Sequence, residues 1–312
     1  MKREALPVVD ALLLFVAIIW AFNFTVVKLA LNNFPPLAFN TLRFICSSLF
    51  FAVYYHIFIK DYEFIKKYFW RLIFLSLIGN TILQILFIEG INYTTASNSS
   101  LMYATVPIFV AILSVILKHE KVKILTWSGI IVSFIGIFFV VSNGSNGLDL
   151  SGDHFRGDIL ILITAFCWSA FTVFAKPLID ETSAVKVVAV TFVFGTIFLI
   201  PFGIPDFVTM DWGIITWNDW GYLFFSFFFA NVIAYLVWFY SVAKVGNVQT
   251  AIFQNMVPIL AVIIAAVFLN EKLTFIQLMG GIGIVAGVTV TRLSRAFMKN
   301  GNHNKLKILN KF

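Results

Sequence analysis

Long apolar segments dominate this chain and decide what it can fold into. Apolar residues make up 60% and charged residues only 12% of the 312 residues, which is far less charge than a soluble domain of this size carries. An α-helix needs about 20 apolar residues to cross ~30 Å of hydrocarbon. Ten segments approach that length, and they lack the strict alternation of a membrane β-barrel. They are residues 9–31, 35–59, 70–92, 96–117, 124–142, 158–179, 183–205, 218–242, 248–269 and 274–292. The sequence therefore predicts an all-α integral membrane protein with ten transmembrane helices.

One pattern occurs twice along the chain, at a constant spacing of 151 residues. Val106-Pro107-Ile108 is followed by Glu120-Lys121, and Val257-Pro258-Ile259 is followed by Glu271-Lys272. A weaker pair agrees, because Trp20 and Lys28 recur as Trp168 and Lys176. We therefore expect two related halves of five helices each, residues 1–147 and 148–298, followed by a basic tail, residues 299–312.

The distribution of basic residues predicts how the halves are oriented. With a cytoplasmic N-terminus, most of the 22 Lys and Arg residues fall on the cytoplasmic side, as the positive-inside rule requires. Both termini are then cytoplasmic in a cell membrane. The outer side receives acidic residues instead: Asp149, Asp153, Asp158, Asp206, Asp211 and Asp219. Because five is odd, the second half enters the membrane inverted, which is the repeat arrangement of many secondary transporters.

Several motifs in this order resemble the EamA family of the drug/metabolite transporter superfamily. They are Trp20-x-x-Asn23, Tyr93-Thr94-x-Ala96-Ser97 leading into Val106-Pro107, and the residues Glu120 and Glu271 after the fourth and ninth helices. The resemblance covers nearly the whole chain. It implies a membrane carrier, commonly an exporter of amino acids, other metabolites or drugs. It also implies a central cavity lined by the first, third, fourth, sixth, eighth and ninth helices.

Pro107 and Pro258 lie near the middle of the predicted fourth and ninth helices. Proline cannot donate to the carbonyl four residues earlier, so the carbonyls of Tyr103 and Gln254 are freed near the bilayer midplane. Freed carbonyls are tolerated only when they are packed in protein or line a wet cavity. We interpret the two prolines as hinges that shape a cavity, with static packing kinks as the alternative.

Polar side chains inside the predicted helices are candidates for a substrate site, because such residues are expensive at membrane depth. Glu89 is the candidate for proton coupling or for contact with a cationic substrate group, and a structural pair with Lys28 or Arg43 is the alternative. Arg43 is too deep to reach the surface and needs a partner, for which Asn23 or Glu89 could serve. The polar candidates are Asn23, Lys28, Arg43, Gln84, Glu89, Gln254 and Asn255.

Five aromatic residues complete the candidate substrate site: Trp20, Tyr103, Trp168, Tyr235 and Trp238. Trp20 and Trp168 are equivalent in the repeat and lie near midspan, away from the interfacial belt where Trp is usually found. Their role is either packing in the core or contact with a flat or cationic ligand.

Glycines form a small-residue face in the last apolar segment, with a sparser version at Gly129 and Gly136 in the fifth. The face consists of Gly280, Gly281, Gly283 and Gly287. Small residues at this spacing allow helices to approach closely in membranes. We expect tight packing within the fold rather than a dimer interface.

Motifs of soluble enzymes are absent from the sequence, including HExxH, GxSxG, Walker A and metal-spaced Cys/His sets. We therefore expect no catalytic residues, no metal site and no cofactor. The net charge of +7 is explained by the cytoplasmic basic residues, so we expect no nucleic-acid partner.

The predicted function is secondary active transport of a small metabolite or drug-like compound by alternating access, with export as the direction. An intramembrane lipid-modifying enzyme and a channel-like facilitator stay open as alternatives. The expected partners are a small-molecule substrate and the lipid bilayer, with protons as a candidate coupling ion. The chain is expected to be a monomer or a homodimer.

Overall fold

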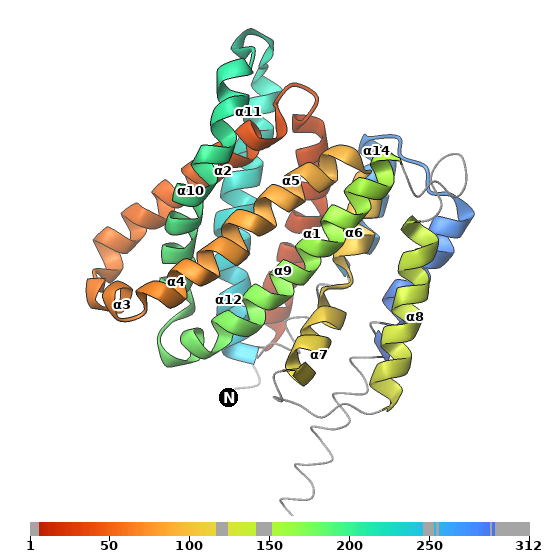
Figure 1. Ribbon diagram of the computed structural model, residues 1–312, viewed down its shortest axis with the longest axis horizontal. Helices are drawn as coiled ribbons and strands as arrows, with labels where there is room; N and C mark the ends of the chain where they lie inside the picture. Colours follow the sequence, from red (N-terminus) through yellow and green to blue (C-terminus); the bar gives the residue numbers. More distant parts are fainter. Residues whose placement is uncertain are drawn as a thin grey trace, which may run out of the picture.

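A computed structural model describes residues 6–116, 124–141, 152–245, 253, 256–287 and 289–290 of the chain. All regular elements in these residues are helices, and no strand occurs among them (Figure 1). Helices satisfy every backbone hydrogen bond within one segment, which lipid requires because it offers no partners. The predicted all-α fold is confirmed for the described part of the chain.

Six helical segments are long and apolar enough to cross a membrane. They are Val8–Ala30, Pro36–Ile59, Phe69–Tyr93, Asp153–Glu181, Ala184–Thr209 and Trp217–Ser241. Three shorter apolar helices, Trp127–Val140, Met256–Phe268 and Phe275–Gly287, also lie within predicted segments. The count of ten spans and their division into two inverted sets of five stay predictions.

The elements before residue 142 include one interrupted helix of particular interest. Its α-helical parts are separated by a π-helical segment in the middle of the span. In order, these elements are α1 (Leu6–Ala30), α2 (Pro36–Tyr54), η2 (Tyr55–Ile59), α3 (Tyr62–Lys67), α4 (Phe69–Ser76), η3 (Leu77–Ile82), α5 (Leu83–Tyr93), α6 (Ala96–Tyr103), α7 (Val106–Ile116) and α8 (Ile124–Val141).

The elements after residue 151 contain a second interrupted helix of the same kind, with a longer π-helical segment. In order, they are α9 (Asp153–Glu181), α10 (Ala184–Thr209), η4 (Trp212–Ile214), α11 (Trp217–Phe224), η5 (Phe225–Ile233), α12 (Ala234–Val245) and α14 (Met256–Phe268). The helix Phe275–Gly287 follows.

Helices from the two parts of the sequence pack against each other throughout the bundle. α2 lies along α10, and α5 lies along α9 (Figure 1). These pairs approach closely because glycine removes the side chain at the contact: a Cβ atom on Gly157 of α9 would lie 2.8 Å from the Gly90 carbonyl oxygen of α5. α1 contacts α6, α12, α14 and η5. This central position of α1 places its side chains between the two parts.

The predicted segment 96–117 is not one continuous helix. α6 ends at Tyr103, a turn occupies Ala104 and Thr105, and α7 begins at Val106. Pro107 is the second residue of α7 and has no N–H to donate to Tyr103, so the helix breaks where the missing bond would have been. The structure therefore places a break, rather than a bend, before Pro107.

The predicted glycine face packs within the fold. A Cβ atom on Gly136 of α8 would lie 2.5 Å from the carbonyl oxygen of Gly280 and 2.7 Å from the amide nitrogen of Ile284. The Cβ atom of a residue at Gly287 would likewise collide with the backbone of Gly129. The prediction of close packing between these two helices is confirmed.

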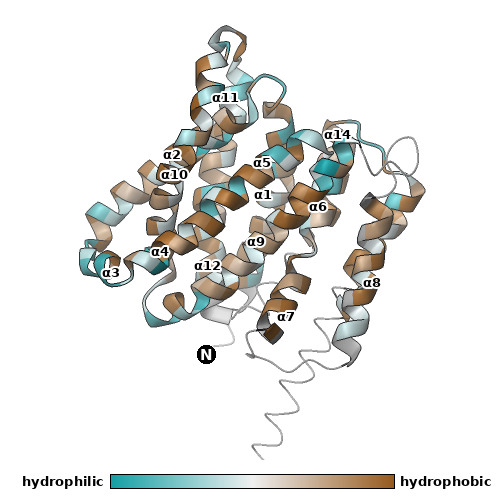
Figure 2. Ribbon diagram, viewed as in Figure 1, coloured by the Kyte–Doolittle hydropathy of each residue, from teal (hydrophilic) through white to brown (hydrophobic). Residues whose placement is uncertain are grey.

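Large apolar side chains cover the outside of the bundle. Phe58 is 71% exposed, Trp70 and Val208 are each 80% exposed, and Trp217 is 91% exposed. Figure 2 shows apolar residues along the length of the helices, with hydrophilic residues concentrated at helix ends such as α3. An apolar surface of this extent is suited to lipid and not to water.

Candidate functional site

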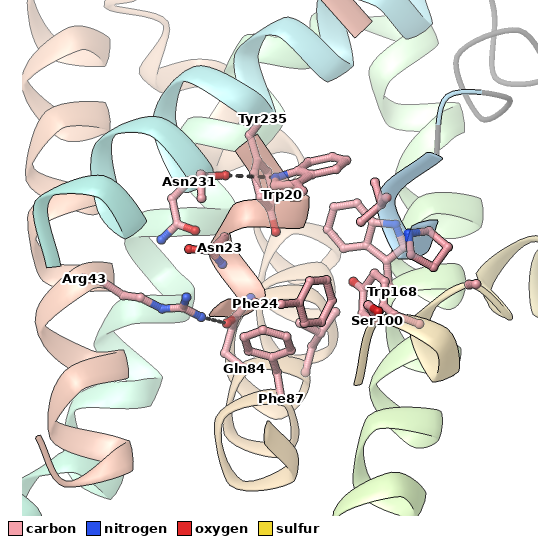
Figure 3. A pocket seen from close by; sticks show the side chains of 16 residues that line it. Trp20, Asn23, Phe24, Arg43, Gln84, Phe87, Ser100, Trp168, Asn231 and Tyr235 are labelled. Carbon is pink, nitrogen blue, oxygen red and sulfur yellow. Dashed lines mark hydrogen bonds between the residues drawn. The ribbon is translucent and has the colours of Figure 1, made fainter. Parts of the chain in front are cut away.

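A cavity of about 80 Å³ lies inside the bundle, between α1, α2, α5, α6, α9, η5, α12 and α14 (Figure 3). A water molecule needs roughly 10–15 Å³ of such volume, so the cavity holds several waters or one small solute. Most of the predicted site residues line it: Trp20, Asn23, Arg43, Gln84, Tyr103, Trp168, Tyr235 and Pro258.

An aromatic cluster centred on Trp20 forms one wall of the cavity. The ring centroid of Trp20 lies 6.2 Å from Trp168 and 6.1 Å from Tyr235, both at nearly perpendicular angles. Trp238 packs on Trp20 at 5.1 Å but is not among the lining residues. Trp20 Nε1 donates to the Ala230 carbonyl oxygen at 3.1 Å. This bond fixes the Trp20 ring and leaves an apolar surface facing the cavity.

A polar network centred on Arg43 forms the opposite wall. Arg43 donates from Nε to Asn40 Oδ1 at 2.7 Å, from Nη1 to Ser226 Oγ at 3.1 Å, and from Nη2 to Gln84 Oε1 at 2.7 Å. Ser226 Oγ donates in turn to Asn23 Oδ1 at 2.8 Å. The network joins α1, α2, α5 and η5 around one guanidinium group.

Arg43 is a buried charge with neutral hydrogen-bond partners. Its side chain is 2% exposed, and no carboxylate oxygen of a described residue lies within 4.0 Å of it. Its guanidinium carbon lies 5.4 Å from the centre of the Phe87 ring and 5.7 Å from that of Phe44, where cation–π attraction offsets part of the lost hydration.

Two π-helical segments position parts of this site. η3 directly precedes Leu83 and Gln84, and η5 contains Ser226, Ala230 and Asn231. A π-helix has one more residue per hydrogen-bonded ring than an α-helix, and such bulges occur frequently at functional sites. Here the Ala230 carbonyl oxygen of η5 accepts a hydrogen bond from Trp20 Nε1. The π-helical turn therefore contributes directly to the cavity wall.

A second cluster of charged residues surrounds the junction between α5 and α6. Glu271 accepts from the amide nitrogens of Ala96 and Ser97, each at 2.9 Å, at the N-terminus of α6. Lys28 Nζ donates to the carbonyl oxygens of Ile91, Asn92 and Thr94, at 2.8, 2.9 and 2.7 Å. We call these contacts of Lys28 and Glu271 with residues 91–97 the junction seal. The helix dipoles favour both charges in these positions.

Glu89 differs from its predicted environment. It is half-buried on α5 and does not line the cavity. No cationic nitrogen of a described residue lies within 4.0 Å of its carboxylate, so the alternative of a pair with Lys28 or Arg43 is not seen in this structure. Lys28 bonds to backbone carbonyls instead, and Arg43 reaches Asn23 through Ser226.

The two prolines lie at different places in the described helices. Pro107 follows the break between α6 and α7, and Pro258 lies near the start of α14 and lines the cavity. Gln254 and Asn255, which we expected to contact substrate, lie outside the described residues.

Three polar contributors were missed by the sequence analysis. Asn231 lines the cavity, and Asn40 and Ser226 hold Arg43. Asn40 and Asn231 lie deep within apolar segments, so the criterion that selected Asn23 would have selected both. Ser226 carries no such signal, because serine is readily accommodated in helices by bonding to its own backbone.

Two acidic residues expected on the outer side are buried in the helical bundle. Asp158 is 2% exposed and accepts from Thr94 Oγ1 at 2.6 Å and from Asn98 Nδ2 at 3.2 Å. Asp219 is also 2% exposed and accepts from the Thr216 backbone at 2.8 Å. Asp219 caps the start of α11 together with Thr216, and Asp158 links α9 to Thr94 and Asn98, so both buried carboxylates have hydrogen-bond partners.

The family of the chain follows from comparison with known proteins. The model of the EamA-like transporter family matches residues 8–142 and again residues 155–293. The chain belongs to this family. The two matched ranges cover most of the chain and include every described residue that lines the cavity.

Two relatives of this EamA-like protein align with it over most of their length. The uncharacterized transporter YetK of Bacillus subtilis is 28% identical over 269 residues, covering 86% of this chain and 82% of that protein. A probable amino-acid metabolite efflux pump of Escherichia coli is 25% identical over 290 residues, covering 89% of this chain and 93% of the pump. A solved crystal structure with 13% sequence identity aligns with a TM-score of 0.64 over 95% of this chain and 99% of the other, which shows a shared fold.

Proposed function

We propose that this EamA-like protein is a secondary active transporter that exports small metabolites or drug-like compounds across the cell membrane by alternating access. One observation carries the proposal: a cavity with room for one small solute lies between helices from the two matched parts of the chain. Its lining combines a polar wall around Arg43 with an aromatic wall around Trp20. Carrier sites of this kind lie at the interface of two repeats near the bilayer midplane.

The proposed architecture is ten transmembrane helices in two inverted halves, residues 1–147 and 148–298, with both termini in the cytoplasm. Two observations support it. The family model matches once in each half, and a π-helical segment interrupts a long apolar helix in each half, at η3 and at η5. On this topology the junction seal lies at the outer end of the bundle. The described structure then corresponds to a state that is closed toward the outside.

The cargo we propose is an amino-acid-related metabolite. The E. coli relative is named as a probable amino-acid metabolite efflux pump, and the cavity has the mixed polar and aromatic lining that suits such a solute. Glu89 stays our candidate for proton coupling, because it is half-buried and has no cationic partner within 4.0 Å among the described residues.

Counterflow in proteoliposomes tests the transport function. Vesicles that contain the purified chain are loaded with unlabelled solute and diluted into labelled solute, for a panel of amino acids, organic acids, nucleosides and drugs, with and without a pH gradient. A carrier accumulates label transiently above equilibrium, and empty vesicles do not. Flux without counterflow would favour a channel-like facilitator, and a newly formed lipid product would favour an intramembrane enzyme. Absence of exchange across the whole panel would contradict the carrier proposal.

A further inference from the structure

The directions of the hydrogen bonds at the polar wall are fixed by Arg43, because a guanidinium group can only donate. Its bond to Gln84 therefore reaches the amide oxygen, which leaves the Gln84 NH₂ group free to donate elsewhere. Ser226 accepts from Arg43, so the hydroxyl proton of Ser226 is donated to Asn23 Oδ1. Asn23 also keeps its NH₂ group as a donor. Both amide side chains line the cavity beside Arg43 (Figure 3).

Arg43 itself has donors left for a ligand. Among the described residues, three of its five N–H groups have acceptors, on Asn40, Ser226 and Gln84. One N–H on each terminal nitrogen remains. The polar wall therefore presents donors from three side chains, Arg43, Asn23 and Gln84, to the same space.

The charge of the cavity is positive and has no counterpart within it. No Asp or Glu is among the described lining residues, and no carboxylate of a described residue lies within 4.0 Å of Arg43. A buried charge that has only neutral partners is costly, and a planar carboxylate matches the guanidinium fork in both charge and shape. An ammonium group in the same place would meet a like charge.

The rest of the cavity suits an apolar body. Its lining includes the rings of Trp20, Phe24, Tyr103 and Trp168. The polar atom of Trp20 is already bonded to the Ala230 carbonyl, so this ring offers only its apolar surface. Aromatic rings favour a flat or hydrophobic partner in edge or offset contact.

We propose that the cavity binds a small organic carboxylate with an aromatic or apolar body. The carboxylate accepts from Arg43, Asn23 and Gln84, and the body packs against the aromatic wall. The binding of this ligand does not depend on the proposed carrier function. Only the further step, that the ligand is the transported substrate, rests on that function. We expect the site to bind anions more tightly than cations that have the same apolar group.

A matched set of ligands with one phenyl ring tests this charge preference. Phenylpropanoate, phenylpropanol and phenylethylamine are titrated against the full chain in detergent, and binding is read from tryptophan fluorescence and from the shift in melting temperature. Phenylpropanoate is expected to bind at least about tenfold more tightly than the other two, because only it gains the charge-assisted bonds. Equal binding of the alcohol or the amine would overturn the proposal. A response to sodium chloride alone that matches the response to phenylpropanoate would also overturn it.

Two substitutions locate the effect at Arg43. Arg43→Met removes the charge with little change in bulk, and replacing a buried charge by an apolar group often leaves folding intact. The preference for phenylpropanoate should then disappear, whereas Lys66→Met at the exposed surface should leave it unchanged. Retention of the full preference in a folded Arg43→Met protein would contradict the assignment.

Asn23→Asp supplies a test that does not depend on removing Arg43. The substitution keeps the shape of the side chain and replaces a donor by a negative charge. Binding should move away from phenylpropanoate and toward phenylethylamine. If the order of affinities is unchanged in this variant, the anion site is wrongly placed.

The carboxylate site and the carrier function fail separately in these experiments. Binding of phenylpropanoate without counterflow would leave the site standing and contradict transport of that ligand. Counterflow of other solutes, with no preference for carboxylates in binding, would support a carrier and overturn the site.

Discussion

Arg43 and Lys28 are both charged side chains within the apolar bundle, but the structure stabilises them differently. Lys28 donates to three backbone carbonyls at the end of α5, and an ammonium group has only three N–H donors. All of its capacity is therefore used within the protein. Arg43 keeps two donors and faces a cavity. We infer that Lys28 maintains the structure of the junction, whereas Arg43 is available to a ligand.

Asp61 illustrates a charged contact outside the apolar segments. It lies between η2 and α3, accepts from Lys186 Nζ at 2.5 Å, and accepts from the Phe64 amide at 3.1 Å. The Lys186 hydrogen bond, with help from that of Phe64, holds the pKa of Asp61 below its ordinary value of 3.8. A lowered pKa in the folded state means that this contact stabilises the fold above the ordinary pKa. The stabilisation is lost as the pH falls through the lowered value.

We predict that Asp61→Asn lowers the melting temperature in detergent at neutral pH but not in strong acid. Near pH 7 the wild-type carboxylate is charged, and the variant loses the ion pair. As the pH falls through the lowered pKa of Asp61, the wild-type carboxyl becomes protonated, so the two proteins should converge in strong acid. Asp180→Asn removes a more exposed pair with Lys176 and should change little at either pH. A difference between Asp61→Asn and wild type that grows on acidification would contradict the assignment.

At the scale of elements, the packing of α8 against the helix Phe275–Gly287 depends on the absence of side chains. The backbone atoms near Gly136 belong to Gly280 and Ile284 and lie 2.5 and 2.7 Å from where a Cβ atom would be. Backbone atoms cannot rotate away as the end of a flexible side chain can, so the two helices must separate to admit even one methyl group.

Gly136→Ala is therefore expected to destabilise the protein by about 1–3 kcal/mol, the usual cost of overpacking, despite the better helix propensity of alanine. Gly221→Ala is the matched control, because it is also helical and nothing lies within 4 Å of its Cβ position. The control should be neutral or stabilising by up to about 1 kcal/mol. Apparent melting temperatures measured by tryptophan fluorescence compare the two variants. Equal effects of both substitutions would refute the close contact.

The junction seal connects α1, the α5–α6 junction and the residues after α14. Glu271 contributes two charge-assisted hydrogen bonds to the N-terminus of α6, which also supplies Ser100 and Tyr103 to the cavity. On the proposed alternating-access mechanism, opening of this end breaks these bonds. Under that proposal the carboxylate of Glu271 controls access to the cavity from one side.

We predict that Glu271→Gln increases access to the cavity from outside the cell. A glutamine has one acceptor oxygen and no charge, and hydrogen bonds to charged groups contribute about 1.5–3 kcal/mol each. Loss of one such bond should raise the labelling rate of Ser100→Cys by an impermeant maleimide about tenfold, in a background without Cys46 and Cys167. Glu63→Gln, at an exposed position, serves as the control. An unchanged labelling rate in Glu271→Gln would show that the seal does not limit access.

At the scale of the whole molecule, hydropathy correctly predicted where most helices lie along the sequence. It is a local property, however, and carries no information about which helices pack together. It could not predict that Arg43 would pair with Ser226, because the two residues are 183 positions apart and meet only through packing. Pro107 predicted a distortion near Tyr103, but the sequence could not show that the helix breaks completely at Ala104 and Thr105, and it gave no sign of the π-helical segments η3 and η5. These features depend on neighbouring helices that satisfy the displaced backbone groups.

The cavity residues could be predicted in part from the sequence. Asn23, Gln84 and Arg43 were selected because polar side chains are costly within apolar segments and therefore often serve a function. All three line the cavity. Glu89 stands out equally but lies outside the lining, because the position of a residue along a helix does not fix which face of the helix it occupies. Only the packed bundle showed which face of α5 points into the cavity.

The proposed topology makes a prediction about the whole chain. Basic residues are expected in the cytoplasm, so α3, with Lys66 and Lys67, should face inward, and the turn around η4 should face outward. In a background without native cysteines, Gly213→Cys should react with an impermeant maleimide in intact cells. Glu63→Cys on α3 should react only after the membrane is permeabilised. Both sites are suitable, because Glu63 and Gly213 are exposed. The reverse labelling pattern would invert the orientation and place the junction seal at the cytoplasmic end, whereas labelling of both sites in intact cells would contradict an odd number of spans between them.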